Sequence, residues 1–183
     1  MSLSKNHVKA QFFRRTVPFP LLLLNINGKQ KITNGRDLTH FAPKEICTRA
    51  EAVTFLWRAA GSPAVQNVKN PFTDVKESSY YYNAVLWAVQ EGITNGVSAD
   101  AFAPSAKCTR AHIVTFLFRA AGAQPAAGAD NPFTDVPENT WYTDSVLWAA
   151  AGGVTNGDGR ADIFHPHQGC NRAMIVTFLY RAQ

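Results

Sequence analysis

The chain has 183 residues, of which 46% are hydrophobic and 17% charged, a composition typical of a folded globular protein. Its formal net charge of +5 comes from residues 1–31, which carry six basic side chains and no acidic one, whereas the remaining 12 basic and 13 acidic side chains nearly cancel. A nearly neutral body argues against a nucleic-acid-binding protein. No apolar run is long enough to span a bilayer.

Residues 1–31 differ from the rest of the chain. Residues 17–26 are apolar and follow two arginines, like the core of a signal peptide, but two prolines interrupt them and no small-residue cleavage site follows. We therefore expect a basic, non-repeat leader that is disordered or arises from a start-site or reading-frame artefact, and we do not expect it to act as a signal peptide.

From residue 32 onward the sequence repeats at a spacing of 61 residues, with one residue inserted late in the third copy. The step Thr-Asn-Gly begins at Thr33, Thr94 and Thr155. A longer motif that ends in Val-Thr-Phe-Leu begins at Cys47, Cys108 and Cys170. Such a period is typical of one supersecondary unit used several times. We divide the chain into a partial first repeat (32–69) and two complete repeats (70–130 and 131–183).

The first repeat predicts one helix. Thr48 and Glu51 have the spacing of a capping box, so this helix should begin at residue 49. The apolar residues that follow recur at helical spacing. The half that precedes this helix in a complete repeat is missing, because residues 11–31 lack the motifs that stand 61 residues later. This loss predicts an incomplete first prong in the fold.

Each complete repeat predicts two helices. A turn with the sequence Asn-Pro-Phe-Thr-Asp-Val precedes an aromatic, amphipathic stretch over residues 80–90 or 141–151. A long loop then leads to a second helix, which is capped by Thr109 or by Asn171. The expected fold is all-α, with tandem helix-loop-helix repeats whose apolar stripes bury one another in a pseudo-threefold, three-pronged bundle.

The order of the motifs Phe-Thr-Asp-Val, Trp-Tyr-x-x-x-Val-x-Trp-Ala, Gly-x-Thr-Asn-Gly, Phe-x-Pro and Thr-Arg-Ala-Glu resembles that of S-layer homology (SLH) domains over residues 32–183. The resemblance implies a module at the bacterial cell surface that anchors proteins non-covalently to a secondary cell-wall polysaccharide. In that family a pyruvylated sugar is often held in grooves between adjacent repeats. We therefore expect a binding module and not an enzyme, with no cofactor, no metal and no nucleic-acid partner.

The resemblance also implies which residues contact the ligand. They are the arginines Arg49, Arg110 and Arg172, the aspartates Asp74 and Asp135, and the loop glycines Gly35, Gly96 and Gly157. The chemistry fits, because an arginine in the first turn of a helix stands beside unpaired amides and can grip a carboxylate through two parallel hydrogen bonds. A purely structural alternative is that each arginine pairs with a carboxylate of a neighbouring unit.

Aromatic residues at the start of the first helices are candidates for stacking on sugar faces, namely Tyr80, Trp141 and Tyr142. Trp87 and Trp148 lie inside those helices and should belong to the core. The first repeat has no equivalent of the aspartates, so the groove that needs the missing half is in doubt.

Two other functions remain open. One is an assembly module that binds proteins and not glycans, and the other is a glycan-processing enzyme. No serine-hydrolase elbow, zinc-protease motif or phosphate loop appears, although a carboxylate pair for glycoside cleavage is not recognisable in sequence. Three equivalent cysteines do not predict a disulfide framework, and a metal site built from them would lack a fourth ligand.

Overall fold

The computed structural model describes residues 32–33, 35–37, 39–125, 128, 130–159 and 162–182, so the expectations for the leader 1–31 lie outside the described residues. The described helices are α2 (Arg49–Ala59), α3 (Tyr82–Gln90), α4 (Arg110–Ala120), α5 (Thr143–Ala151) and α6 (Arg172–Arg181). Extended pairing in this part of the chain is limited to isolated bridges. The predicted all-α class is confirmed.

The second helices begin where the capping residues predict. In α2 the Thr48 hydroxyl accepts the Glu51 amide at 3.2 Å, and the Glu51 carboxylate accepts the Thr48 amide at 2.8 Å. In α4 the imidazole of His112 takes the place of this carboxylate, and its Nδ1 accepts the Thr109 amide at 3.1 Å. A neutral histidine therefore completes a capping box in the second repeat.

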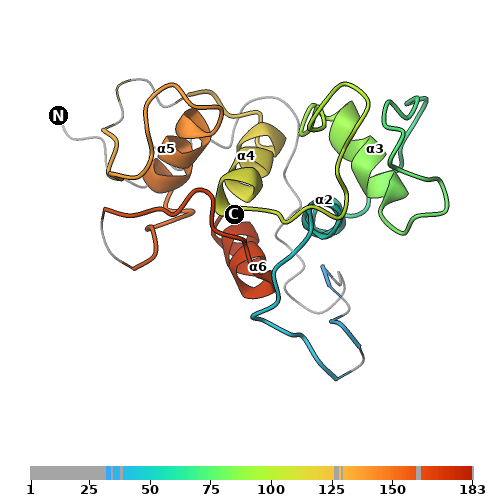
Figure 1. Cartoon of the computed structure of the whole chain (residues 1–183), viewed down its shortest axis with the longest axis horizontal. Coiled ribbons are helices and arrows are strands. Elements are labelled where there is room, and N and C mark those ends of the chain that lie inside the picture. Colours follow the sequence, from blue (N-terminus) through green and yellow to red (C-terminus); the bar gives the residue numbers. More distant parts are fainter. Residues whose placement is uncertain are drawn as a thin grey trace.

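Helices of successive repeats lie side by side, as Figure 1 shows. α3 of the second repeat lies against α2 of the first, and α5 of the third repeat lies against α4 of the second. The three second helices, α2, α4 and α6, contact one another pairwise. Each outer pair thus joins the second helix of one repeat to the first helix of the next.

A closed ring of backbone hydrogen bonds joins the starts of α2, α4 and α6. The Cys47 amide donates to the Cys170 carbonyl at 3.0 Å, the Cys108 amide to the Cys47 carbonyl at 2.8 Å, and the Cys170 amide to the Cys108 carbonyl at 2.7 Å. All three cysteines are fully buried. The third repeat is therefore fastened directly to the first. The contacts are cyclic, while the predicted pseudo-threefold symmetry stays a prediction.

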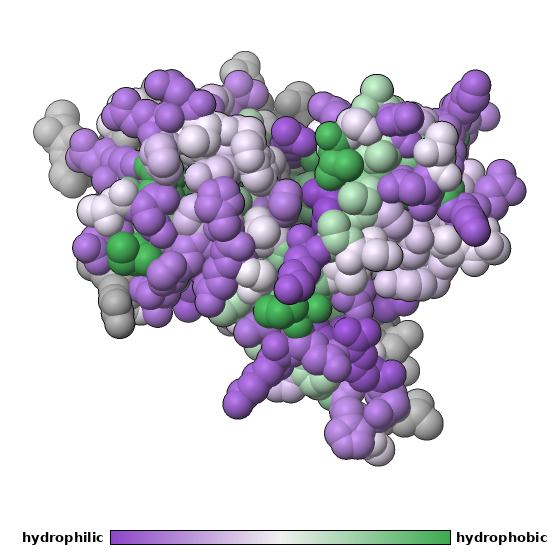
Figure 2. All heavy atoms as spheres, viewed as in Figure 1, coloured by the Kyte–Doolittle hydropathy of each residue, from purple (hydrophilic) through white to green (hydrophobic). Residues whose placement is uncertain are grey.

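One apolar core runs through the repeats and includes Trp87 and Trp148, as predicted. Figure 2 shows hydrophilic side chains over most of one face, with apolar residues as small separate patches. Burial of each large apolar side chain contributes about 1.5–3 kcal/mol to the free energy of folding. Among the helices that the structure describes, none has the length and hydropathy that a membrane crossing requires.

The outer side of α6 differs from that of α4. On α4, the Phe118 ring lies 5.8 Å from the ring of Trp148 on α5, and Thr115 is buried. At the equivalent positions on α6, Tyr180 is 62% exposed and Thr177 is exposed. No helix of the described residues covers this side of α6. Within the described residues, the prong without an outer helix is thus the one built on α6 of the third repeat. An incomplete first prong stays a prediction.

Replacing Phe118 and Tyr180 by alanine should therefore have different effects. Phe118→Ala removes a contact with a buried tryptophan and should lower the free energy of unfolding by about 1–3 kcal/mol. Tyr180→Ala removes a mostly exposed ring and should change it by less than about 0.5 kcal/mol. Urea unfolding of the two variants measures both values, and equal losses would mean that α6 has an outer partner.

Candidate functional site

Each of the three arginines leaves the start of its own helix and enters the next repeat. The guanidinium carbon of Arg49 lies 4.8 Å from the ring centre of Phe102 and 5.5 Å from that of Phe116. Arg110 lies at 4.7 and 5.3 Å from Phe164 and Phe178, and Arg172 at 5.1 and 5.2 Å from Phe41 and Phe55. Such cation–π contacts are each worth about 0.5–2 kcal/mol, more when they are shielded from water.

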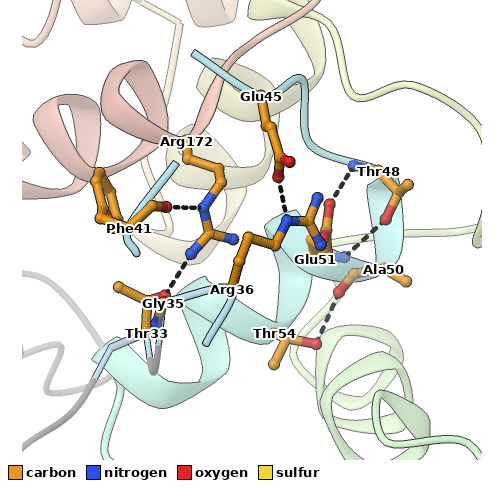
Figure 3. Close-up of polar contacts among 10 residues, drawn as sticks. All are labelled: Thr33, Gly35, Arg36, Phe41, Glu45, Thr48, Ala50, Glu51, Thr54 and Arg172. Carbon is orange, nitrogen blue, oxygen red and sulfur yellow. Dashed lines mark hydrogen bonds and ion pairs between the residues drawn. The ribbon is translucent and has the colours of Figure 1, made fainter. Parts of the chain in front are cut away.

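Hydrogen bonds fix each guanidinium between its two rings. The Nε atoms of Arg49, Arg110 and Arg172 donate to the carbonyls of Phe102, Phe164 and Phe41 at 2.9, 2.7 and 2.7 Å. Arg110 also donates from Nη2 to the Gly157 carbonyl at 2.9 Å, and Arg172 from Nη2 to the Thr33 hydroxyl at 2.8 Å. Figure 3 shows the Arg172 contacts.

Burial of these cations has an electrostatic cost. The exposed fractions are 3% for Arg49, 4% for Arg110 and 2% for Arg172. Desolvation lowers the pKa of Arg49 and of Arg110 below the ordinary value, and the charges of Asp74 and Asp135 oppose this effect. No carboxylate oxygen of the described residues lies within ion-pair distance of Arg49. The rings and a backbone carbonyl, and not the carboxylate proposed as an alternative, therefore hold this cation.

The two aspartates fasten the same loops from the other side. Asp74 accepts the Phe102 amide at 2.9 Å and the Ala103 amide at 2.7 Å, and Asp135 accepts the Phe164 and His165 amides at 2.8 and 2.6 Å. Phe102 is thus held by Asp74 at its amide and by Arg49 at its carbonyl. In the first repeat, the Phe41 carbonyl binds Arg172, but the chain has no aspartate at the corresponding position.

The three loop glycines adopt left-handed backbone conformations, with φ of +77° at Gly35, +82° at Gly96 and +77° at Gly157. A Cβ at Gly96 would lie 2.5 Å from the Ala101 carbonyl oxygen and 2.5 Å from the Phe72 ring. Steric crowding therefore explains glycine at this position. Of the three, Gly157 directly accepts a hydrogen bond from a site arginine.

The aromatic candidates separate into two groups. Tyr80 is 64% exposed and Trp141 is 55% exposed, and the Trp141 ring lies 5.0 Å from the ring of His112. Tyr142 is only 4% exposed, so its predicted role as an exposed stacking residue is wrong. It lies within the core and meets the ring of His167 edge-on at 5.6 Å. The stacking roles of Tyr80 and Trp141 stay predictions.

Sequence reasoning missed the phenylalanine rings that flank each arginine. One belongs to the Phe-x-Pro motif and the other to the Val-Thr-Phe-Leu motif of the next repeat. A signal was present, since both rings recur in all three repeats, as the arginine does. Their separation in sequence from the arginine hid the contact, because Arg49 and Phe102 are 53 residues apart.

The starts of the second helices do converge, as a shared cysteine site would require. Burial raises the pKa of the Cys47 and Cys170 thiols to about 12, so both stay protonated at neutral pH. In the described part of the chain, no group of three or more histidine, cysteine, aspartate and glutamate side chains is arranged to hold a metal ion.

The structure defines an all-helical tandem-repeat module whose repeats are joined by buried arginines. The family model of the S-layer homology domain matches residues 71–113 and 132–173. The chain therefore belongs to the S-layer homology family, as the motif order predicted.

Several proteins with known descriptions are similar to this chain. A cell surface protein of Thermoanaerobacter kivui is 33% identical over 135 residues, which are 72% of this chain and 17% of that protein. A surface-layer 125 kDa protein of Lysinibacillus sphaericus is 34% identical over 119 residues, 64% of this chain and 10% of that protein. An endoglucanase of Bacillus sp. (strain KSM-635) is 28% identical over 112 residues, 61% of this chain and 12% of the enzyme. The chain thus spans less than one fifth of each relative.

Arg110→Met should destabilise the fold because it leaves the buried Phe164 carbonyl and the partly buried Gly157 carbonyl without this donor and removes the charge from between two rings. We expect a loss of about 2–4 kcal/mol in the free energy of unfolding. The control is Arg58→Met, since Arg58 is only half-buried and its side chain makes no hydrogen bond or ion pair with the described residues. Denaturant unfolding compares the two, and similar small losses would contradict a structural role for Arg110.

Gly96→Ala should cost more stability than Gly92→Ala. Both glycines have left-handed φ, +82° and +66°, so each substitution carries the penalty of about 1 kcal/mol for that conformation. A Cβ at Gly92 meets nothing within 4 Å, whereas one at Gly96 meets backbone and ring atoms at 2.5 Å. Overpacking should add about 1–3 kcal/mol at Gly96 alone. Thermal unfolding of both variants measures the difference, and equal losses would contradict the crowding.

Stability should fall as the pH drops from about 6.5 towards 4. Burial, aided by the charges of Arg49 and His167, lowers the pKa of His112 to about 4. In this window the unfolded chain binds a proton at His112 that the folded chain does not, so acid favours unfolding. His112→Gln keeps a cap acceptor without titrating and should flatten the dependence of the urea midpoint on pH. An unchanged slope would contradict this origin.

Proposed function

We propose that this chain is a non-covalent anchoring module at the bacterial cell surface that holds an anionic, pyruvylated secondary cell-wall polymer at the contacts between repeats. S-layer homology domains are wall-anchoring modules, and the relatives described as surface proteins are consistent with this role. The polymer is bound without being changed. The single observation that carries the proposal is that the Nη donors of the buried Arg49 side chain have no hydrogen-bond acceptor among the described residues.

Arg49 uses one donor for the fold and keeps others available. Its Nε donates to the Phe102 carbonyl, whereas its Nη atoms donate to no acceptor among the described residues. Neither Nη atom is fully buried, so each keeps a small contact with solvent although Arg49 as a whole is only 3% exposed. A guanidinium held rigid by two rings, with outward donors unused, is well suited to grip a carboxylate.

The three arginine sites differ in the charge beside them, at the residue that follows the loop glycine. That residue is Val97 near Arg49, Asp158 near Arg110 and Arg36 near Arg172. The negative charge of Asp158 acts on Arg110. Arg36 forms ion pairs with Glu45 and Glu51, as Figure 3 shows. The Arg49 site therefore combines a buried cation with the least competition from neighbouring charges, and we expect the tightest binding there.

Other residues of the site have supporting roles in this proposal. Asp74 and Asp135 fix the loops that present the sugar-binding surface, and the glycines Gly35, Gly96 and Gly157 allow the chain to turn beside the arginines. Tyr80 and Trp141 offer exposed ring faces for stacking on a sugar. Arg172 contributes least, because its loop lacks the aspartate.

Co-sedimentation of the whole chain with peptidoglycan sacculi tests the proposal. Binding should occur to intact sacculi and disappear after the secondary polymers are stripped. Arg49→Lys keeps the charge but loses the planar fork, so it should bind at least about tenfold more weakly, which corresponds to about 1.4 kcal/mol. The matched control, Arg58→Lys, should bind like the unaltered chain, and circular dichroism should confirm that both variants are folded.

Competition identifies the group that is recognised. A free sugar with a pyruvate ketal should release the bound chain, while the same sugar without the acid should not. Equal binding to intact and stripped sacculi would assign the affinity to peptidoglycan instead. Absence of binding to both, together with concentration-dependent oligomers, would favour the assembly module.

A further inference from the structure

We propose that the outer face of α6, formed by Met174, Thr177 and Tyr180, is a docking site for an amphipathic helix of the α3 and α5 kind, supplied by a different protein that carries this repeat and not by a second copy of this chain. The inference is independent of glycan binding. It rests on a comparison of α6 with two helices of the same structure whose equivalent faces are covered.

The α4–α5 pair shows how such a face is filled. The Trp148 ring of α5 meets Phe118 edge-on at 5.8 Å between ring centres, and Trp141 lies 5.0 Å from the ring of His112. Thr115, between these positions on α4, is 3% exposed. Two aromatic residues seven positions apart thus lie along one side of the covering segment and span two turns of α4.

α6 has the corresponding residues without the cover. Met174 stands where α4 has His112, and Tyr180 stands where α4 has Phe118. Thr177 is exposed, whereas its equivalents Thr54 and Thr115 are each 3% exposed. Thr177 and Tyr180 therefore face solvent in the described structure, while Met174 is partly buried against the core beside them.

The face is continuous with an established interface. α6 already contacts α2 and α4, and the outer sides of those two helices continue into their contacts with α3 and α5. A third helix in the same position would complete a set of which two members are built. In Figure 1, α6 lies next to α2 and α4 and away from α3 and α5. In a repeat protein, equivalent helix faces pack against equivalent neighbouring helices.

The sequence states what the occupant must look like. Tyr80 and Trp87 in one repeat, and Trp141 and Trp148 in the next, share the seven-residue spacing. Residues 11–31, which occupy the corresponding place before the first helix, lack this pattern. Residues 11–31 therefore do not supply the pattern, and the first half of an S-layer homology repeat from a different protein is the chemistry that fits.

The test uses the whole chain and a synthetic peptide of residues 131–153. Fluorescence anisotropy should show one peptide bound per chain, and the Trp148→Ala peptide should bind at least about tenfold more weakly. Tyr180→Ala in the chain should weaken binding about fivefold without lowering its melting temperature. Hydroxyl-radical footprinting should show that bound peptide protects Met174 and Tyr180 from oxidation.

A short isolated peptide is only marginally helical in water, so a second experiment builds the covering helix into the chain itself. Replacing residues 11–31 with a copy of residues 72–92 restores the missing half at the correct spacing. The melting temperature should rise by about 5 °C, and Met174 and Tyr180 should become protected. An unchanged melting temperature with both residues still oxidised would overturn the proposal.

Three further results would also overturn it. A peptide affinity that is unchanged by Tyr180→Ala would place the peptide elsewhere, for example where it displaces α5. Protection of Met174 and Tyr180 in the monomer before peptide is added would show that the chain's own leader covers the face. Protection that appears only in a dimer detected by sedimentation would assign the face to contacts between copies.

Discussion

The structure depends on one contact that is made three times, an arginine buried between two phenylalanine rings of the next repeat. Burying a cation without a paired carboxylate is costly, so the surrounding groups must replace its lost water. Two rings and a backbone carbonyl do so at Arg49. The Phe-x-Pro loop must then present its carbonyl, Asp74 must hold the amide of the same loop, and Gly96 must turn the chain beside it.

The structural role of these arginines is compatible with the ligand-binding role that we propose for them. Nε serves the fold, while the outer edge of the Arg49 guanidinium remains available. Lysine has a single ammonium group, so it could not bond the loop carbonyl from one side and present a planar pair of donors to a carboxylate from the other. A site built in this way exists only where two repeats meet. The proposed affinity would therefore depend on the integrity of the bundle, so glycan binding and stability should be measured on the same variants.

Much of this fold was predictable from sequence, because local signals carry it. Capping residues fixed the starts of α2 and α4, and apolar spacing identified the helices. Periodicity says which face of a helix is buried but not which helix covers it, so the pairing of α3 with α2 was not evident. Trp141 and Tyr142 show a second limit. They are adjacent and chemically alike, and both lie in the turn before α5, yet only Trp141 is exposed. Helical periodicity does not assign a face to residues that precede the first helical turn.

Closure of the ring has a consequence for the order of folding. Arg172 binds Phe41 and Thr33 across sequence separations of 131 and 139 residues. Contacts between distant residues require costly loop closure and slow the search for the native state. During synthesis the first two repeats emerge well before α6, and domains generally fold from the N-terminal side. The first repeat therefore lacks the Arg172 contact with Phe41 and Phe55 until α6 leaves the ribosome.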